Sequence, residues 1–200
     1  RVDATLRAVR AQPRGLVYLY WGDIDKVGHV HGCDSHEWVA ELESVDAELA
    51  RLASSLPRDT ALHITADHGM VDVPLEARPD IATDADLDAG VRHVSGEPRC
   101  VQLHVRPGAR DDVVDTWRAR LGEDALVVTT EEAIEAGWFG TVSASVRPRI
   151  GDVIAAMTGP VAVVDSRRHR PELRSLLGVH GSITADEVAV PWLVLSPQEQ

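Results

Sequence analysis

The chain has 200 residues and a formal net charge of -12, from 20 lysines and arginines against 32 aspartates and glutamates. A surface with this charge repels a nucleic-acid backbone, so the composition argues against polymeric DNA or RNA as a partner. Hydrophobic residues make up 44% of the chain, which excludes a disordered protein, and no apolar run approaches the roughly 20 residues that span a bilayer.

The first predicted elements are a helix and a buried strand. VDATLRAVRAQ (2–12) predicts a short helix, and GLVYLYW (15–21) is an apolar run of buried-strand length. The polar stretch WGDIDKVGHVHGCDSH that follows has neither helical nor strand periodicity. We therefore expect residues 21–33 to form a loop.

A longer helix is predicted by an apolar stripe with steps of four and three residues. The stripe comprises Trp38, Leu42, Val45, Leu49, Leu52 and Leu56. Asp34 or Ser35 is the expected cap of this helix, and Pro57 marks its end. TALHITA (60–66) is a second buried-strand candidate, with a polar loop behind it at 67–74.

The order of strand, loop, helix, strand and loop predicts a βαβ unit and hence a parallel sheet. Ligands of such sheets bind at the carboxyl edge of the strands. Both polar loops, 21–33 and 67–74, are therefore expected on the same rim.

Shorter elements follow from residue 75. We expect strands, helices and apolar runs at 99–107, 109–122, 125–129, 130–138, 146–157 and 159–166, after an irregular acidic stretch at 77–90. Residues 75–178 as a whole predict a small α+β insertion beside the main sheet. A loop at 177–188 and a final strand at 189–197 complete the chain. The predicted division is 1–74 as core with metal loops, 75–178 as insertion, and 179–200 as the return to the core.

Each of the two early polar loops carries a carboxylate and an imidazole. In DIDKVGH, Asp25 and His29 are separated by three residues, and Gly28 would let the backbone turn so that both face one divalent ion. In ADHGM, Asp67 and His68 are adjacent, so they converge only if the preceding strand has ended. The pattern predicts that both pairs are presented at the rim of the sheet.

A late His-Gly pair in VHGS adds His180 just before the final strand. The five candidate ligands, Asp25, His29, Asp67, His68 and His180, offer oxygen and nitrogen but no sulfur. This donor set favours zinc, with manganese or another divalent metal as the alternative. Two such ions, about 3.5–4 Å apart, would hold the attacking and leaving oxygens of a phosphoryl transfer.

These motifs together resemble a known enzyme family. YLYWGDIDKVGHVHG, then ADHGM, then the late HG pair are similar to the type I phosphodiesterase and nucleotide pyrophosphatase branch of the alkaline phosphatase superfamily. The resemblance covers residues 14–74 and 179–196. It implies an α/β fold, an alkaline-phosphatase-like three-layer sandwich with a central, mostly parallel sheet that is incomplete at the N-terminus.

The resemblance also assigns roles. It implies that Asp25, His29 and His180 bind one metal ion, and that Asp67 and His68 bind the other. The family's second ion takes a further aspartate and a nucleophilic threonine from an upstream segment that has no counterpart in these 200 residues. We therefore expect a carboxyl-terminal part of a longer enzyme, with no catalytic nucleophile of its own and no activity by itself.

The expected activity is metal-dependent hydrolysis of phosphodiester or pyrophosphate bonds in nucleotides or related small molecules. Phosphomonoesterases, phosphonate hydrolases and phosphomutases of the same superfamily are the nearest alternatives, and a non-catalytic metal-binding domain is the alternative from another class. The expected partner is a small phosphoester. The sequence leaves the cellular compartment and the oligomeric state open.

Overall fold

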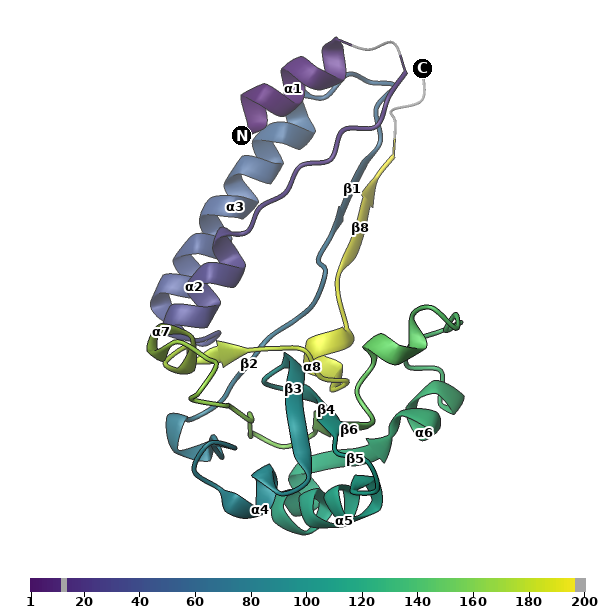
Figure 1. The fold of residues 1–200 in the computed structure, drawn as a ribbon. Helices are drawn as coiled ribbons and strands as arrows, with labels where there is room; N and C mark the ends of the chain where they lie inside the picture. Colours follow the sequence, from purple (N-terminus) through teal and green to yellow (C-terminus); the bar gives the residue numbers. More distant parts are fainter. Residues whose placement is uncertain (12–13, 197–200) are drawn as a thin grey trace.

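The computed structural model describes residues 1–11 and 14–196, which form an elongated arm and a rounder body (Figure 1). The arm comprises α1 (Val2–Arg10), α2 (Asp23–His31), α3 (His36–Ser55), β1 (Leu62–Thr65) and β8 (Trp192–Leu195). Helices were predicted at 2–12 and along the stripe to Leu56, and α1 and α3 confirm both. Gln12, the last residue of the first prediction, lies outside the described residues.

Helix α3 begins where its cap was expected. The Ser35 hydroxyl accepts a hydrogen bond from the Trp38 amide at 3.1 Å, which satisfies one free donor of the first turn. On the apolar stripe, Leu52 is fully buried and packs with Val2 and Leu6 of α1. The two helices therefore lie side by side along the arm.

Residues 15–21 are extended but do not form the predicted strand. Leu19 and Trp21 pack against the cluster between α1 and α3, whereas Leu16 and Tyr18 are 96% and 84% exposed. This alternation is that of a strand. The prediction of a strand is nevertheless wrong within the described residues, because a strand also needs a hydrogen-bonded neighbour and none of them supplies one.

The other two strands of the arm form at the expected places, but they run antiparallel, and the prediction that 60–66 is a buried strand was wrong because no residue of β1 or of its partner β8 is buried. β1 pairs with β8 from Leu62 opposite Leu195 to Thr65 opposite Trp192. Pro197, the last residue of the predicted final strand, lies outside the described residues. Every ladder between described strands is antiparallel, so the parallel pairing expected from the βαβ order is not formed within them.

The body is a four-stranded antiparallel sheet with the order β3-β4-β6-β5. Its strands are β3 (Val91–Glu97), β4 (Cys100–Val105), β5 (Ala125–Thr129) and β6 (Val153–Met157), and its helices are α4 (Ala85–Asp88), α5 (Arg110–Leu121) and α6 (Thr130–Glu135). This arrangement has the expected α+β character, and its role as an insertion beside the main sheet stays a prediction. β3 was missed because VRHVSGE carries few apolar residues, and the predicted apolar run at 159–166 forms no strand among the described residues.

Helix α5 covers one face of this sheet. Trp117 is fully buried, and its indole nitrogen donates a hydrogen bond to the carbonyl of Leu87 at 3.2 Å. The sheet side of the same core includes Val101, Leu103 and Met157. The body thus has a hydrophobic core separate from that of the arm.

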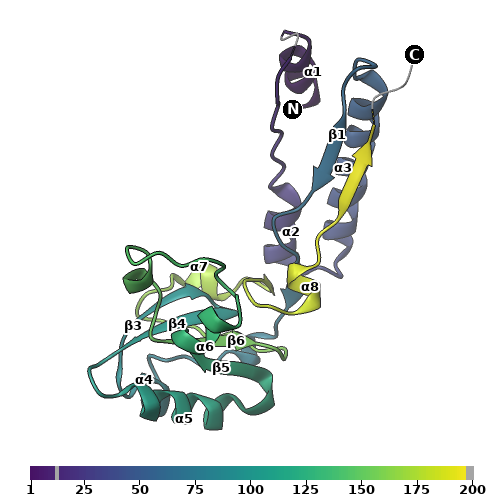
Figure 2. The same ribbon diagram turned by 90° about the vertical axis from the view of Figure 1, so that its right-hand side faces the viewer.

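The remaining described elements are short, and some of them lie near the junction of the arm and the body (Figure 2). They are β2 (Val71–Asp72), η1 (Leu75–Ala77), η2 (Gly122–Asp124), η3 (Arg147–Arg149), α7 (Pro171–Arg174), β7 (Gly178–Val179) and α8 (Ala185–Val188). α8 sits close to the junction itself. Among the helices of residues 1–11 and 14–196, none is long and apolar enough to cross a membrane.

Candidate metal centre

Asp25 and His29 lie on a helix and not on the predicted loop. They are four residues apart on α2, so both side chains lie on one face, and His29 Nε2 is 3.2 Å from Asp25 Oδ1. Gly28 is helical and has no positive φ. The expected backbone turn at Gly28 was therefore wrong, and it is the helical period that brings the two groups together.

The pairing of β2 with β7 brings the other two motifs together. Val71 lies opposite Val179, so the residues just before β2 and just after β7 face each other. His180 directly follows β7 and His68 lies three residues before β2, and their rings stack with centroids 3.6 Å apart. The two-strand ladder is short, but it fixes which histidines meet.

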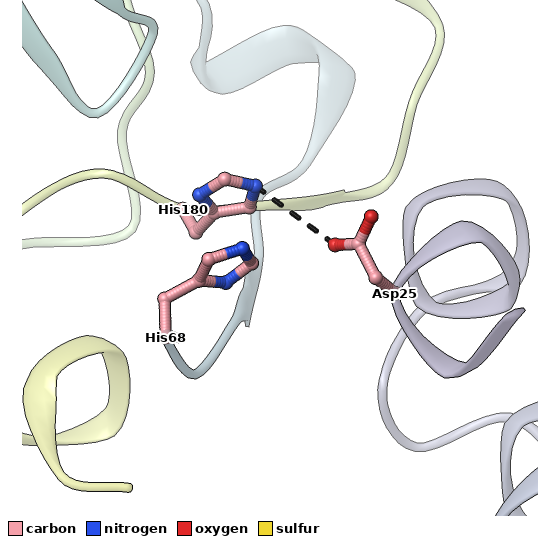
Figure 3. A group of neighbouring side chains, drawn as sticks. All are labelled: Asp25, His68 and His180. Atoms are coloured by element: carbon pink, nitrogen blue, oxygen red, sulfur yellow. Dashed lines mark ion pairs between the residues drawn. The ribbon is translucent and has the colours of Figure 1, made fainter. Parts of the chain in front are cut away.

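Asp25 completes a cluster with these two histidines (Figure 3). Ligand-type atoms of Asp25, His68 and His180 all lie within 4.8 Å of one another. His180 Nε2 is 3.9 Å from Asp25 Oδ1, the pair marked by the dashed line in Figure 3. Three separate segments of the chain thus supply one carboxylate and two imidazoles at one point.

His29 borders this cluster and has a defined tautomer. Its Nδ1 is 2.7 Å from the carbonyl oxygen of Gly178, which can only accept, so Nδ1 carries the proton and the neutral ring leaves a lone pair on Nε2. The same holds for His68, whose Nδ1 is 2.8 Å from the Gly69 carbonyl. Both rings therefore offer Nε2 as a metal ligand.

Asp67 borders the cluster. Its side chain is 71% exposed, and its Oδ1 lies 3.8 Å from His68 Nε2. Asp23, a second carboxylate of the first motif, pairs with Arg1. His63 is exposed on β1.

Glycines allow the three segments to approach one another. A Cβ at Gly28 would lie 2.8 Å from the Met70 sulfur, and a Cβ at Gly178 would lie 2.5 Å from the Gly28 carbonyl oxygen. The glycine of the Gly-His pair and the methionine of ADHGM are thus packing partners. Gly178 was not predicted as part of the site, since a residue that acts through its backbone carbonyl leaves little trace in sequence.

The donor set fits a divalent cation. Asp25 Oδ1 is buried and has no hydrogen-bond partner among the described residues, which is costly for a carboxylate unless a cation compensates it. Two imidazole nitrogens and a carboxylate oxygen at this spacing form a donor set that zinc prefers. The residues present therefore match the predicted kind of site.

The same surroundings act on His180. Burial, followed by the neighbouring rings of His68 and His29, lowers the pKa of His180 below its ordinary value, against the opposing charges of Asp25 and Glu97. A histidine with a lowered pKa in the folded chain takes up its proton more readily in the unfolded chain. Its contribution to stability is present above about pH 6.5 and is lost as the pH falls through the folded-state pKa.

We therefore expect the metal-free protein to lose more unfolding free energy than its His180→Gln variant when the pH falls from about 7.5 to about 5.5. Urea unfolding of both proteins at the two pH values measures this difference. Equal losses would show that His180 does not resist protonation in the folded chain.

Comparison with known proteins places this chain in a family. Residues 2–183 match the family described as type I phosphodiesterase / nucleotide pyrophosphatase. Ectonucleotide pyrophosphatase/phosphodiesterase family member 7 of Rattus norvegicus is 33% identical over 81 residues, which is 38% of this chain and 18% of that protein. The chain thus spans less than a fifth of this curated relative.

Solved structures share the fold. Ectonucleotide pyrophosphatase / phosphodiesterase 5 matches with a TM-score of 0.75 for the murine protein and 0.73 for the human one, each at 22% identity over 98% of this chain and 51% of the other. A phosphonoacetate hydrolase from Sinorhizobium meliloti matches with a TM-score of 0.62, at 24% identity over 85% of this chain and 43% of the other. The fold is therefore alkaline-phosphatase-like, as expected, and the chain covers about half the length of these proteins. With the family match extending over most of its length, the chain belongs to the type I phosphodiesterase / nucleotide pyrophosphatase family.

Proposed function

We propose that this chain carries the metal-binding part of a hydrolase that cleaves phosphodiester or pyrophosphate bonds in nucleotides or related small molecules. The observation that supports it is the convergence of Asp25, His68 and His180 in a chain of this family. One structure of the murine relative is an inactive form in complex with AMP, and the bacterial one contains phosphonoformate. Small phosphorus-containing anions are accordingly the proposed substrate class.

In this proposal the centre holds two divalent ions, zinc by first choice and manganese as the alternative. Asp25, His29 and His180 would hold one ion, and Asp67 with His68 the other. Bound divalent cations stabilise negative charge on phosphoryl oxygens and lower the pKa of a hydroxyl nucleophile. The chain's own contribution is to orient the rings of His29 and His68 through the Nδ1 hydrogen bonds to the Gly178 and Gly69 carbonyls, which leaves Nε2 of each neutral ring as the ligand atom.

The nucleophile in this proposal is a threonine outside these 200 residues, and no residue of the chain is assigned that role. The 200-residue chain alone is then expected to bind metal without hydrolysing phosphoesters. A phosphonate hydrolase is the second candidate function, favoured by the structural similarity to phosphonoacetate hydrolase. A non-catalytic metal-binding domain is the third.

The test combines elemental analysis with hydrolysis of a nitrophenyl nucleotide phosphodiester, the matching phosphomonoester and phosphonoacetate. It compares this chain with a longer polypeptide that supplies the upstream threonine. Diester hydrolysis by the zinc-loaded longer form alone would support the proposal. Selective phosphonoacetate cleavage would favour the second candidate, and metal binding without hydrolysis in either form would favour a non-catalytic domain.

A further inference from the structure

A buried ion pair connects the body of the protein to the metal centre. Arg99 lies in the turn between β3 and β4 and is 1% exposed, and Glu187 lies on α8 and is 2% exposed. Arg99 Nη2 donates to Glu187 Oε2 at 2.8 Å, and Arg99 Nε donates to Oε1 at 3.2 Å. The contact is therefore a two-pronged guanidinium–carboxylate pair with a fixed geometry.

The carboxylate of Glu187 also organises the loop that carries His180. Oε1 accepts a hydrogen bond from the Ser182 amide at 2.9 Å, and Oε2 accepts one from the Thr184 hydroxyl at 2.6 Å. Burial acts to raise the pKa of Glu187, but the hydrogen bonds from Arg99, Thr184 and Ser182 bring it below its ordinary value. The group is thus a carboxylate that shapes the chain two residues beyond His180.

The backbone of the same residue holds the other histidine loop. The Gly69 amide donates to the Glu187 carbonyl oxygen at 2.8 Å. Gly69 follows His68 directly in ADHGM. Glu187 therefore contacts both loops whose histidines stack in the cluster, one through its side chain and the other through its main chain.

Arg99 is in turn anchored in the sheet of the body. Its guanidinium donates to the carbonyl of Val161 at 2.8 Å and to that of Met157 at 3.2 Å, and it also bonds the carbonyl of Gly159. The Ser182 hydroxyl donates to the same Met157 carbonyl at 2.7 Å. The His180 loop is thus tied to the end of β6 as well as to the β3–β4 turn.

A second contact places the β3–β4 turn against the same loop. Gly181, next to His180, has a φ of +120°, and a Cβ there would lie 2.5 Å from the Cβ of Glu97 at the end of β3. Only a residue without a side chain allows this approach. The turn therefore rests directly on the backbone that carries His180.

A buried ion pair adds little net stability compared with apolar side chains, because removing both charges from water costs as much as their attraction returns. Its fixed geometry is the property that apolar packing would not supply. Resting on the proposed function, we propose that Arg99 and Glu187 are positioning residues of the metal centre. The pair locks the His68 and His180 loops onto the body and so sets the spacing of the two imidazoles.

The test measures metal binding by this chain directly. Removal of one partner alone would leave a buried charge unpaired, so the main variant carries Arg99→Met and Glu187→Gln together. Titration with Co²⁺ gives the affinity and a visible spectrum that reports ligand geometry, and Zn²⁺ competition with a chromophoric chelator gives a second affinity. Circular dichroism and thermal unfolding report folding in each case.

We expect about 10–100-fold weaker metal binding and a changed Co²⁺ spectrum in the double variant, as for residues that orient metal ligands. Arg99→Lys keeps the charge but loses the two-pronged contact, and it covers the case in which the double variant does not fold. It should weaken binding about tenfold.

Asp165→Asn is the matched control. Asp165 is a carboxylate with 1% exposure that forms ion pairs with Arg167 and Arg168, and Arg167 also pairs with Asp88, the last residue of α4. This variant should lose stability while keeping the wild-type affinity and Co²⁺ spectrum.

Wild-type affinity and spectrum in folded Arg99 and Glu187 variants would overturn the positioning role and leave the proposed metal centre intact. An equal loss of affinity in Asp165→Asn would also overturn it, because any loss of stability would then suffice. A wild-type chain that binds neither Co²⁺ nor Zn²⁺ would overturn the proposed metal centre, and this inference with it.

Discussion

Replacement of Asp25 by alanine is expected to empty the metal site that it is proposed to form with His29 and His180. Asp25 is the member of the cluster that lies within 4 Å of two histidines, at 3.2 Å from His29 Nε2 and 3.9 Å from His180 Nε2. Without it, His29 and His180 lose the carboxylate that lies nearest to both of their Nε2 atoms. The loss of metal affinity should exceed the roughly 10–100-fold typical of residues that only orient ligands.

In the longer polypeptide the same change should lower kcat/KM by at least about a thousandfold, equivalent to about 4 kcal/mol of transition-state stabilisation. Elemental analysis of the purified chain and diester hydrolysis by the longer form measure the two effects. His63→Gln is the control, because His63 is exposed on β1 and lies beside Trp192, with ring centroids 5.4 Å apart. Equal metal content in wild type and Asp25→Ala would count against the assignment of Asp25.

The sequence predicted well the elements whose side chains face an apolar core. The stripe of α3 and its Ser35 cap are examples, because a helix packed on one side must repeat its apolar residues with the helical period. Helix α2 escaped prediction since DIDKVGHVH has no such stripe and Gly28 is its one buried residue. Its register is set by contacts far away in sequence, such as the hydrogen bond between the His29 carbonyl and the Leu177 amide at 2.7 Å.

In the candidate site, too, some features were predictable from the sequence and others depend on contacts between distant residues. The motifs with Asp25, His68 and His180 were predicted to meet from their order and residue types, and they lie together. The stacking of His68 on His180, with His29 to one side, depends on the register between β2 and β7. Each of these strands has only two residues, which is too short for the register to be predicted from the sequence. The role of Glu187 escaped notice for a similar reason, because its partner Arg99 is 88 residues away.

Replacement of Gly69 by alanine is the second change with a large expected effect. A Cβ at Gly69 would collide with the carbonyl oxygen of Asp186 and lie 3.0 Å from the carbonyl carbon of the same residue. The obstacle is backbone, which cannot rotate away as a flexible side chain could. The DHG loop or α8 must therefore move, and the hydrogen bond from the Gly69 amide to the Glu187 carbonyl would be stretched or lost.

We expect Gly69→Ala to cost about 1–3 kcal/mol of unfolding free energy and to weaken zinc binding about tenfold or more, because the movement separates the His68 loop from the His180 loop. Gly108→Ala is the control: Gly108 has a φ of +82° with open space around it, so an alanine there is strained by about 1–2 kcal/mol without displacing a neighbour. Urea unfolding and zinc competition on both variants compare the effects. If the His68 loop is displaced, zinc affinity should fall in Gly69→Ala but not in Gly108→Ala. Equal zinc affinities in the two variants would show that the Gly69 contact does not position His68.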